Sequence, residues 1–304
     1  MKILISGASG LVGLALTKSF RAEGHEVAHL VRAHAGATSL SPGDVRWNPA
    51  RGEIDVAALE CADAVIHLSG ASIADGRWNA ARKELLRTSR VDSTRLLVKA
   101  LAAVRQKPRI FLSSSAVGIY GDRGDEILTE TSAPGADFLS SVAIEWEAEA
   151  SRAEESGIRT VILRFGVILA REGGALPKMI MPFRLGIGGR LGSGKQWMSW
   201  VSLEDVVGAT RAALNDENMK GPVNVVAPNP VRNEEFTRVL AQVLLRPAIL
   251  PAPAFALRLA LGEMADALLL ISQRVDPERL HSAHYAFRHT ELEPALRATL
   301  KGTA

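Results

Sequence analysis

Short continuous apolar runs alternate with longer amphipathic segments through the first half of the chain. A run of this kind predicts a strand covered on both faces, and apolar residues three or four positions apart predict a helix with one buried face. The predicted strands begin at residue 2 and then cover 26–32, 62–70, 109–121 and 160–166, and the predicted helices cover 11–22, 79–104 and 138–156. This order predicts an α/β fold with a doubly wound parallel sheet.

The pattern changes after residue 170, where glycines and prolines interrupt the chain and helical segments follow. We therefore expect a sheet domain over residues 1–170 and a smaller, partly helical substrate lobe over 171–304, with a C-terminal helical domain from about residue 249. The lobe is expected to be interleaved, because the apolar run 224–227 has the composition of a strand that returns to the main sheet. The run 254–271 has about the length of a membrane span, but its three charged residues favour a packed helix.

Three glycines lie where the first predicted strand gives way to the first predicted helix. In a dinucleotide-binding turn, one glycine permits the tight turn, one lets the diphosphate approach the backbone, and one lets the helix pack close to the sheet. The amides at the start of the helix then point at the phosphates. Because these glycines sit between a strand and an amphipathic helix, dinucleotide binding is favoured over a purely structural turn. The residues predicted to contact the cofactor here are Gly7, Ser9, Gly10, Leu11, Val12 and Gly13.

Arg32 closes the second predicted strand, nineteen residues after Gly13. At about this distance an acidic residue binds the ribose 2′-hydroxyl of NAD(H), whereas an arginine accommodates the 2′-phosphate of NADP(H). We therefore expect NADP(H) to be favoured over NAD(H). The alternative is that Arg32 is a solvent-facing charge at a strand end.

The third predicted strand, residues 62–70, ends in Leu68, Ser69 and Gly70. Strand carboxyl ends in a parallel sheet line the ligand crevice, so these three residues are predicted neighbours of the cofactor. His67 lies inside the strand, and a single histidine there is more often a satisfied core residue than a catalytic base.

Composition narrows the class of protein. With 304 residues, 47% hydrophobic and 23% charged, the chain has the make-up of a folded globular protein. The formal net charge is only +3 and the basic residues are scattered, so no nucleic-acid partner is expected. The single cysteine, Cys61, cannot form an internal disulfide, and no signal sequence precedes the first predicted strand, so we expect a cytoplasmic protein without a membrane partner. His281 and His284 lack further ligands at suitable spacing, so no metal site is predicted.

Several segments together resemble a known family. The glycine set, the strand at 63–70, the serines before Tyr120 and the segment Trp200–Asp205 are similar to those of an extended short-chain dehydrogenase/reductase. Further segments resemble its atypical epimerase-like subgroup, often labelled NAD-dependent epimerase/dehydratase or nucleoside-diphosphate-sugar epimerase, and the tail resembles the C-terminal helical domain of that subgroup. These segments are Leu163–Leu169, Gly173–Trp200 and Pro251–Leu296, the last with Gln273–Pro277 and Tyr285–Arg288.

The resemblance implies a Rossmann-type fold, a nicotinamide cofactor and reversible oxidation of a sugar hydroxyl. Typical members use a serine or threonine together with Tyr-x-x-x-Lys on the following helix, where the lysine lowers the proton affinity of the tyrosine. This chain departs from that pattern. Neither Tyr120 nor Tyr285 is followed by lysine at the fourth position, and the predicted helix 138–156 carries neither residue type.

Ser114 or Ser115 holds the matching hydroxyl position after the strand. Our working hypothesis is that Ser115 orients the substrate and that Tyr120 carries the proton, because both follow the strand end that should meet the nicotinamide. The alternative for Tyr120 is a loop aromatic that packs over the cofactor. Arg164, in the segment that resembles the subgroup, is predicted to contact the cofactor.

The segment Gly189–Lys195 resembles a phosphate loop, but Gln196 replaces the required serine or threonine and a predicted strand follows instead of a helix. We therefore exclude ATP binding there. Arg184, Arg190 and Lys195 are candidates to hold an anionic substrate group such as a diphosphate. The alternative is a solvated hairpin.

Two interpretations of function stay open. The first is an NADP(H)-dependent oxidoreductase or epimerase that acts on a nucleotide sugar or a similar hydroxylated small molecule. The second is a regulatory or sensor protein that binds NADP(H) without turnover, which the missing Tyr-x-x-x-Lys favours. Activity has to be argued from the site, because one fold hosts many functions.

Overall fold

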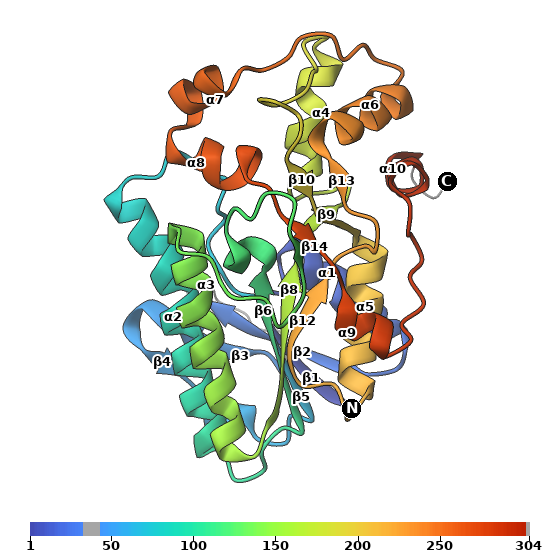
Figure 1. Cartoon of the computed structure of the whole chain (residues 1–304). Coiled ribbons are helices and arrows are strands. Elements are labelled where there is room, and N and C mark those ends of the chain that lie inside the picture. The colour runs from blue at the N-terminus through green and yellow to red at the C-terminus, as the bar shows by residue number, and fades with distance from the viewer. Residues whose placement is uncertain (33–42, 302–304) are drawn as a thin grey trace.

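The computed structural model describes residues 1–32 and 43–301. Within them, eight strands form one sheet in the order β12-β8-β6-β5-β1-β2-β3-β4, and all neighbours are parallel except β3 and β4 (Figure 1). The strands are β1 (Lys2–Ser6), β2 (Glu26–Arg32), β3 (Val45–Asn48), β4 (Glu53–Ile54), β5 (Ala64–His67), β6 (Ile110–Ala116), β8 (Arg159–Phe165) and β12 (Gly221–Val225). The predicted parallel sheet is confirmed.

Helices cover both faces of this sheet (Figure 1). Successive strand residues point to opposite faces, so Ile3 and Ile5 pack with the helices of one face and Leu4 packs with those of the other. Burying each such side chain contributes about 1.5–3 kcal/mol, which explains why the three central positions of the strand are all apolar. The helices are α1 (Leu11–Ala22) and α5 (Leu203–Asn215) on the first face, and α2 (Ala80–Ala103) and α3 (Phe138–Ser151) on the second.

The predicted boundaries differ from the observed ones where backbone geometry changes. The strand predicted over 109–121 ends at Ala116, and a 3-10 turn from Val117 to Tyr120 follows. The helix predicted over 138–156 is α-helical to Ser151 and continues as a 3-10 turn. The edge strands β3 and β4 were not predicted, because they are too short to show a clear apolar pattern.

Most segments beyond residue 166, with α5 and β12 as exceptions, build a second layer above the carboxyl ends of the strands (Figure 1). Its core is a buried cluster that includes Leu176, Phe183, Phe236, Leu240 and Leu296. The elements of this layer are β9 (Val167–Leu169), α4 (Leu176–Arg184), β10 (Trp197–Met198), β11 (Trp200–Ser202), β13 (Val231–Arg232), α6 (Asn233–Leu244) and α10 (Leu292–Lys301).

The strand expected over 224–227 lies slightly earlier in the chain. It is β12, which pairs with β8 from Val161 to Phe165 at the edge of the main sheet. Ala227 leaves this ladder because its N–H donates to the Trp200 carbonyl at 2.6 Å. The division of the chain into two domains near residue 170 stays a prediction.

The apolar stretch 254–271 does not form the single packed helix that we expected. Gly262 adopts a φ of 64°, which ends α7 (Ala254–Leu261) and separates it from α8 (Glu263–Ala265) and a π-helical turn over 266–270. No residue of α7 is buried by the described part of the chain. Residues 1–32 and 43–301 contain no helix that is both long enough and apolar enough to cross a membrane.

The tail after this stretch returns to the sheet. A short strand, β14 (Arg274–Val275), pairs with β7 (Ile127–Leu128), and α9 (Glu278–Ser282) packs beside β12. The side-chain amide of Gln273 donates to the carbonyls of Val117 and Gly121, just beyond the end of β6. The tail is therefore built into the region that follows β6.

Candidate functional site

The turn between β1 and α1 is shaped by three close backbone approaches. Gly7 has a φ of +70°, and a Cβ there would lie 2.8 Å from the Leu68 carbonyl carbon. A Cβ on Gly13 would lie 2.6 Å from the Cα of Ala8, and one on Gly10 would lie 3.3 Å from the Gly7 oxygen. Side chains at Gly7 and Gly13 would therefore force the backbone apart, which is the geometry of a turn that lets a phosphate approach closely.

The start of α1 has the electrostatics of an anion site. The N-cap is Gly10, no side chain among the described residues caps the helix, and its first turn carries no acidic residue. Ser9 is exposed and Leu11 and Val12 are half-buried at this end of the helix. Amides left unpaired at a helix start attract an anion such as a diphosphate.

Arg32 is exposed at the carboxyl end of β2, the strand next to β1. The residues that follow it, 33–42, lie outside the described part of the chain. A contact of Arg32 with a 2′-phosphate stays a prediction.

The end of β5 lies against the same turn. The N–H of Leu68 donates to the carbonyl and the hydroxyl oxygen of Ser6, and Ser69 and Gly70 follow toward the surface. His67 is fully buried and hydrogen-bonds with Ser6 at 2.6 Å and with Thr94 at 3.0 Å. Burial lowers the pKa of His67 to about 3, so the ring is neutral and acts as a structural link between β1, β5 and α2.

The serines of β6 point to different partners. The Ser114 hydroxyl donates to the carbonyl of His67 at 3.0 Å, so it is used within the sheet. The Ser115 hydroxyl donates to Oε1 of Glu147 on α3 at 2.6 Å. Ser115 thus has a charged partner that fixes its orientation, and Ser114 does not.

Glu147 is the functional residue that sequence reasoning missed. It is 9% exposed, and both its oxygens accept from Arg164, Oε1 from Nε at 2.8 Å and Oε2 from Nη2 at 2.7 Å. Glu145 and Glu149 lie on the same helix, and their sequence context offers no signal that separates them from Glu147. Only the packing of α3 against β6 and β8 does so.

Arg164 does not lie where we predicted it. We expected a cofactor contact, but the guanidinium is buried and also donates from Nη1 to the Tyr120 hydroxyl at 2.9 Å and to the Glu130 carbonyl at 3.2 Å. Its donors are therefore used inside the protein, where they hold Glu147. This placement argues for a positioning role instead of a cofactor contact.

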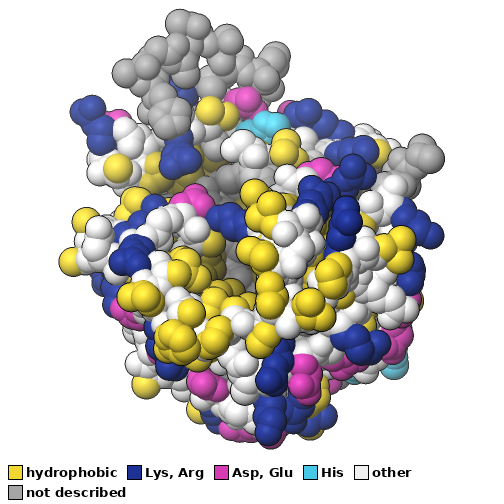
Figure 2. Space-filling model, turned by 90° about the horizontal axis from the view of Figure 1, so that it is seen from above, with side chains coloured by type: hydrophobic (Ala, Val, Ile, Leu, Met, Phe, Trp, Pro, Cys, Tyr) yellow, Lys and Arg dark blue, Asp and Glu magenta, His cyan; other side chains and the backbone are white. Residues whose placement is uncertain are grey.

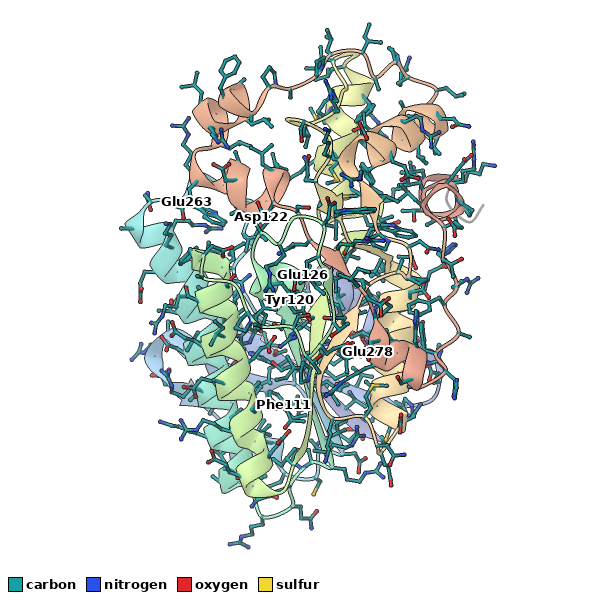
Figure 3. All side chains as sticks on the ribbon, viewed as in Figure 1. Phe111, Tyr120, Asp122, Glu126, Glu263 and Glu278 are labelled. Carbon is teal, nitrogen blue, oxygen red and sulfur yellow. The ribbon has the colours of Figure 1, made fainter. Side chains whose placement is uncertain are left out.

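Tyr120 is closed off from solvent. It is fully buried in the middle of the molecule (Figure 3), and its hydroxyl donates to Oδ1 of Asn224 at 2.7 Å. Burial raises the pKa of Tyr120, which opposes release of its proton. Neither of its predicted roles, as proton carrier or as an aromatic over the cofactor, fits this placement.

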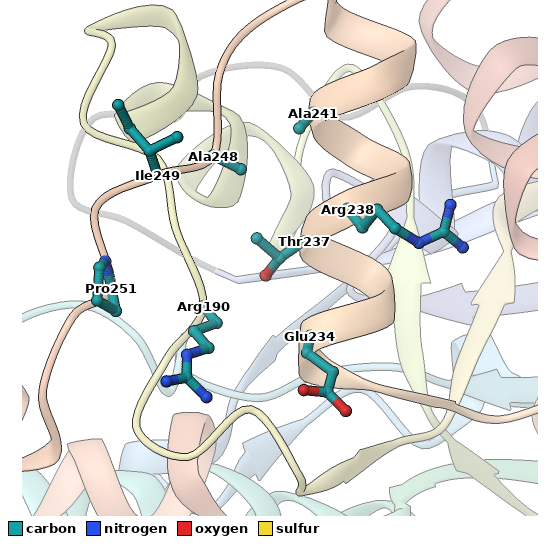
Figure 4. A pocket seen from close by; sticks show the side chains of 8 residues that line it. All are labelled: Arg190, Glu234, Thr237, Arg238, Ala241, Ala248, Ile249 and Pro251. Carbon is teal, nitrogen blue, oxygen red and sulfur yellow. The ribbon is translucent and has the colours of Figure 1, made fainter.

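The three cations expected to hold an anionic substrate do not share one described pocket. Arg184, Arg190 and Lys195 are all exposed. Arg190 lines a pocket of about 450 Å³ between α6 and residues 248–251, where Glu234 and Arg238 also lie (Figure 4), whereas the other two do not line it. Arg184 is the last residue of α4, and the solvated-hairpin interpretation is favoured for Lys195.

One edge of the sheet carries the glycine turn, the end of β5 and Ser115. Viewed from above that edge, the surface is hollowed near its centre and hydrophobic side chains surround the hollow (Figure 2). Arg32 ends β2, the glycine turn follows β1, Leu68–Gly70 follow β5, and Ser115 is the next-to-last residue of β6. These four strands are neighbours in the order β2, β1, β5, β6. Ligands of open parallel sheets bind at such an edge.

Comparison with known proteins agrees with this geometry. The sequence profile of the NAD dependent epimerase/dehydratase family matches residues 3–227. This chain belongs to that family. A second profile, described as a domain of unknown function (DUF1731), matches residues 252–299 of this epimerase-family protein. The resemblance expected from the sequence is therefore confirmed, including a separate C-terminal segment.

Individual relatives match along nearly the whole chain. The epimerase family protein Mb2239 of Mycobacterium bovis is 43% identical over 294 residues, 97% of this chain and 96% of its own. The crystal structure of human epimerase family protein SDR39U1 (isoform 2) with NADPH superposes with a TM-score of 0.89 at 32% identity and covers both chains fully. The nucleoside-diphosphate sugar epimerase of Corynebacterium glutamicum gives a TM-score of 0.80 at 36% identity, over 97% of this chain and 57% of that one.

The residues of this epimerase-family protein fit a dinucleotide at the β1–α1 turn. Backbone atoms leave no room for a Cβ at Gly7 or Gly13. Helix α1 begins with no side-chain cap among the described residues and no acidic residue in its first turn, so neither competes with a phosphate for its amides. The family match supports an NAD(P)-type cofactor here. Gly7, Gly10, Gly13 and the first amides of α1 would hold its diphosphate.

Proposed function

We propose that this protein is an NADP(H)-dependent oxidoreductase or epimerase that acts on a hydroxyl of a nucleotide sugar or a similar small molecule. The observation that carries the proposal is that the glycine turn after β1 and the Ser115–Glu147 pair at the end of β6 lie at the same edge of the sheet, with only β5 between the two strands. The printed names of two relatives support it, since one structure contains NADPH and the other protein is called a nucleoside-diphosphate sugar epimerase. When bound, a nicotinamide accepts or donates hydride at the hydroxyl carbon.

Ser115 supplies the orientation of the substrate. A serine hydroxyl has one proton to donate and two lone pairs to accept with. Because that proton is donated to Glu147, Ser115 can offer a ligand only its lone pairs. It therefore accepts a hydrogen bond from a substrate alcohol and gives none to a ketone, so the site selects the alcohol form.

Glu147 keeps Ser115 in this state. Its two hydrogen bonds from Arg164 fix the position of the carboxylate, whose Oε1 accepts the hydrogen bond from the Ser115 hydroxyl. Both carboxylate oxygens are thus occupied by contacts inside the protein, so we assign Glu147 to positioning and not to general base catalysis.

A second candidate function is a sensor that binds NADP(H) without turnover. Burial of Tyr120 and the absence of tyrosine and lysine from α3 favour it, because the proton carrier used by typical members is missing.

Incubation with a panel of sugar nucleotides and small hydroxy and carbonyl compounds tests the proposal, with net hydride transfer followed by NADPH absorbance and epimerisation followed by chromatography of the sugars. We expect turnover of at least one compound, and a Ser115→Ala variant should lose about 10- to 100-fold in kcat/KM because the hydroxyl is no longer aligned, with the Kd for NADPH unchanged. Ser113→Ala, a matched change on the same strand face, is the control. NADPH binding without any turnover would support the sensor, and an unchanged Ser115→Ala rate would remove Ser115 from the mechanism.

A further inference from the structure

Arg90 on α2 is a half-buried cation beside the end of β5. Its guanidinium carbon would lie 3.2 Å from a Cβ on Gly70, the residue predicted to neighbour the cofactor. Its Nη1 donates to the Leu86 carbonyl and its Nη2 to the Ala71 carbonyl, each at 3.0 Å. The guanidinium also lies over the ring of Trp146 on α3, 5.4 Å from the centroid.

The charge of Arg90 has no neutralising partner in the described residues. Arg87 and Arg95 on the same helix are paired with Glu145 and Glu149 of α3, whereas no ion pair of residues 1–32 and 43–301 includes Arg90. Burial, and secondly the nearby cation Arg82, lower the pKa of Arg90 to about 10. A buried cation without a counter-charge is costly unless a ligand supplies one.

Arg90 lies between the two parts of the proposed site. On one side it contacts Gly70, which follows β5 and its contact with the glycine turn. On the other side its guanidinium lies over the ring of Trp146. The next residue in the sequence is Glu147, which accepts the hydrogen bond of Ser115. A dinucleotide that runs from the glycine turn toward Ser115 would pass this guanidinium with its nicotinamide-side phosphate and ribose.

We propose that Arg90 binds the nicotinamide-side phosphate of the dinucleotide. Three of its five N–H groups are not used by the two carbonyl contacts, and a guanidinium fork matches phosphate oxygens. The carbonyls and Trp146 hold the fork in place before the ligand arrives. This inference rests on the cofactor part of the proposed function and does not depend on turnover.

Fragments of the cofactor can show which of its phosphates Arg90 contacts. We expect Arg90→Met to weaken NADPH and 2′-phospho-ADP-ribose by about 10- to 100-fold, because both carry the second phosphate, as measured by calorimetric Kd. Adenosine 2′,5′-bisphosphate lacks that phosphate and should bind within about threefold of the wild-type Kd. Arg90→Lys, which keeps the charge without the fork, should fall between wild type and Arg90→Met.

The control is Arg87→Met, which removes an equal charge from the same helix but loses only a partnered surface cation. An unchanged NADPH Kd in Arg90→Met would overturn the proposal, as would an equal loss for all three ligands, which indicates the adenosine-side phosphate or a damaged fold. If Arg90→Met does not fold, the Kd values of Arg90→Lys for the same three ligands test the proposal instead. A wild-type protein that binds no NADPH would defeat the proposed function itself, a result distinct from equal binding by wild type and variant.

Discussion

Neighbouring side chains on β6 face opposite sides of the sheet, so Ser114 and Ser115 meet unlike partners although they are chemically the same. Ser114 bonds a carbonyl of β5, and Ser115 bonds a carboxylate of α3. The second contact involves an ion and is the stronger kind of hydrogen bond. At the scale of single residues, the role of each serine is thus decided by the partner that the fold brings to it.

At the scale of single residues, the preference for NADPH over NADH is predicted to depend on Arg32. Replacing it in an Arg32→Asp variant should weaken NADPH by at least about tenfold and strengthen NADH, because an acidic residue binds the free 2′-hydroxyl and repels the 2′-phosphate. Fluorescence titration with both cofactors measures the ratio of Kd values. Arg51→Asp, at a position 73% exposed, controls for the change in net charge. Equal preference for the two cofactors in wild type and variant would contradict the assignment.

The β1–α1 turn acts as one element because three glycines let strand, turn and helix approach closely. Gly13→Ala should lower both stability and NADPH affinity, the latter by more than about tenfold, because its Cβ would meet the backbone of Ala8 and push α1 away from the turn. Thermal melts and NADPH titration measure the two effects. In Gly118→Ala the new Cβ would lie 3.8 Å from its nearest neighbour, so this control should change little, and equal behaviour of the two variants would refute the packing argument.

Elements that carry their own local signal could be predicted from the sequence. The helix 11–22 and the strand 26–32 match α1 and β2, since periodicity and glycine punctuation mark both ends. The residues of the site were harder to predict from the sequence. Arg164 and Tyr120 look like ligand-facing residues in sequence, but contacts with Glu147 and Asn224, which are distant along the chain, turn them inward. Arg90 carried no motif at all, and only the fold shows that it lacks an acidic partner.

At the scale of the whole molecule, Glu130 joins the tail to the centre of the fold. Its Oε1 accepts from the backbone N–H of Asn224 in β12 at 2.9 Å and of Arg279 in α9 at 3.3 Å. Its Oε2 is buried and has no partner among the described residues. Burial therefore raises the pKa of Glu130, although these backbone donors oppose the rise.

This raised pKa predicts a pH-dependent difference in stability. A carboxyl whose pKa is raised by folding favours the folded state below its ordinary pKa, and that contribution is lost as pH rises through the folded value. A Glu130→Gln variant lacks this titration. Its Tm minus that of wild type should therefore increase between pH 4 and pH 8 in thermal melts. The exposed Glu126→Gln serves as the control, and a constant difference over that range would contradict the expectation.

The contacts of Gln273 with the turn after β6 have a consequence for biosynthesis. A ribosome delivers the glycine turn and the serines long before it delivers residue 273, and chains tend to fold from the N-terminus as they emerge. The carbonyls of Val117 and Gly121 therefore lack this partner until residue 273 has been synthesised. A nascent chain that stalls earlier would expose an unfinished crevice to chaperones and proteases.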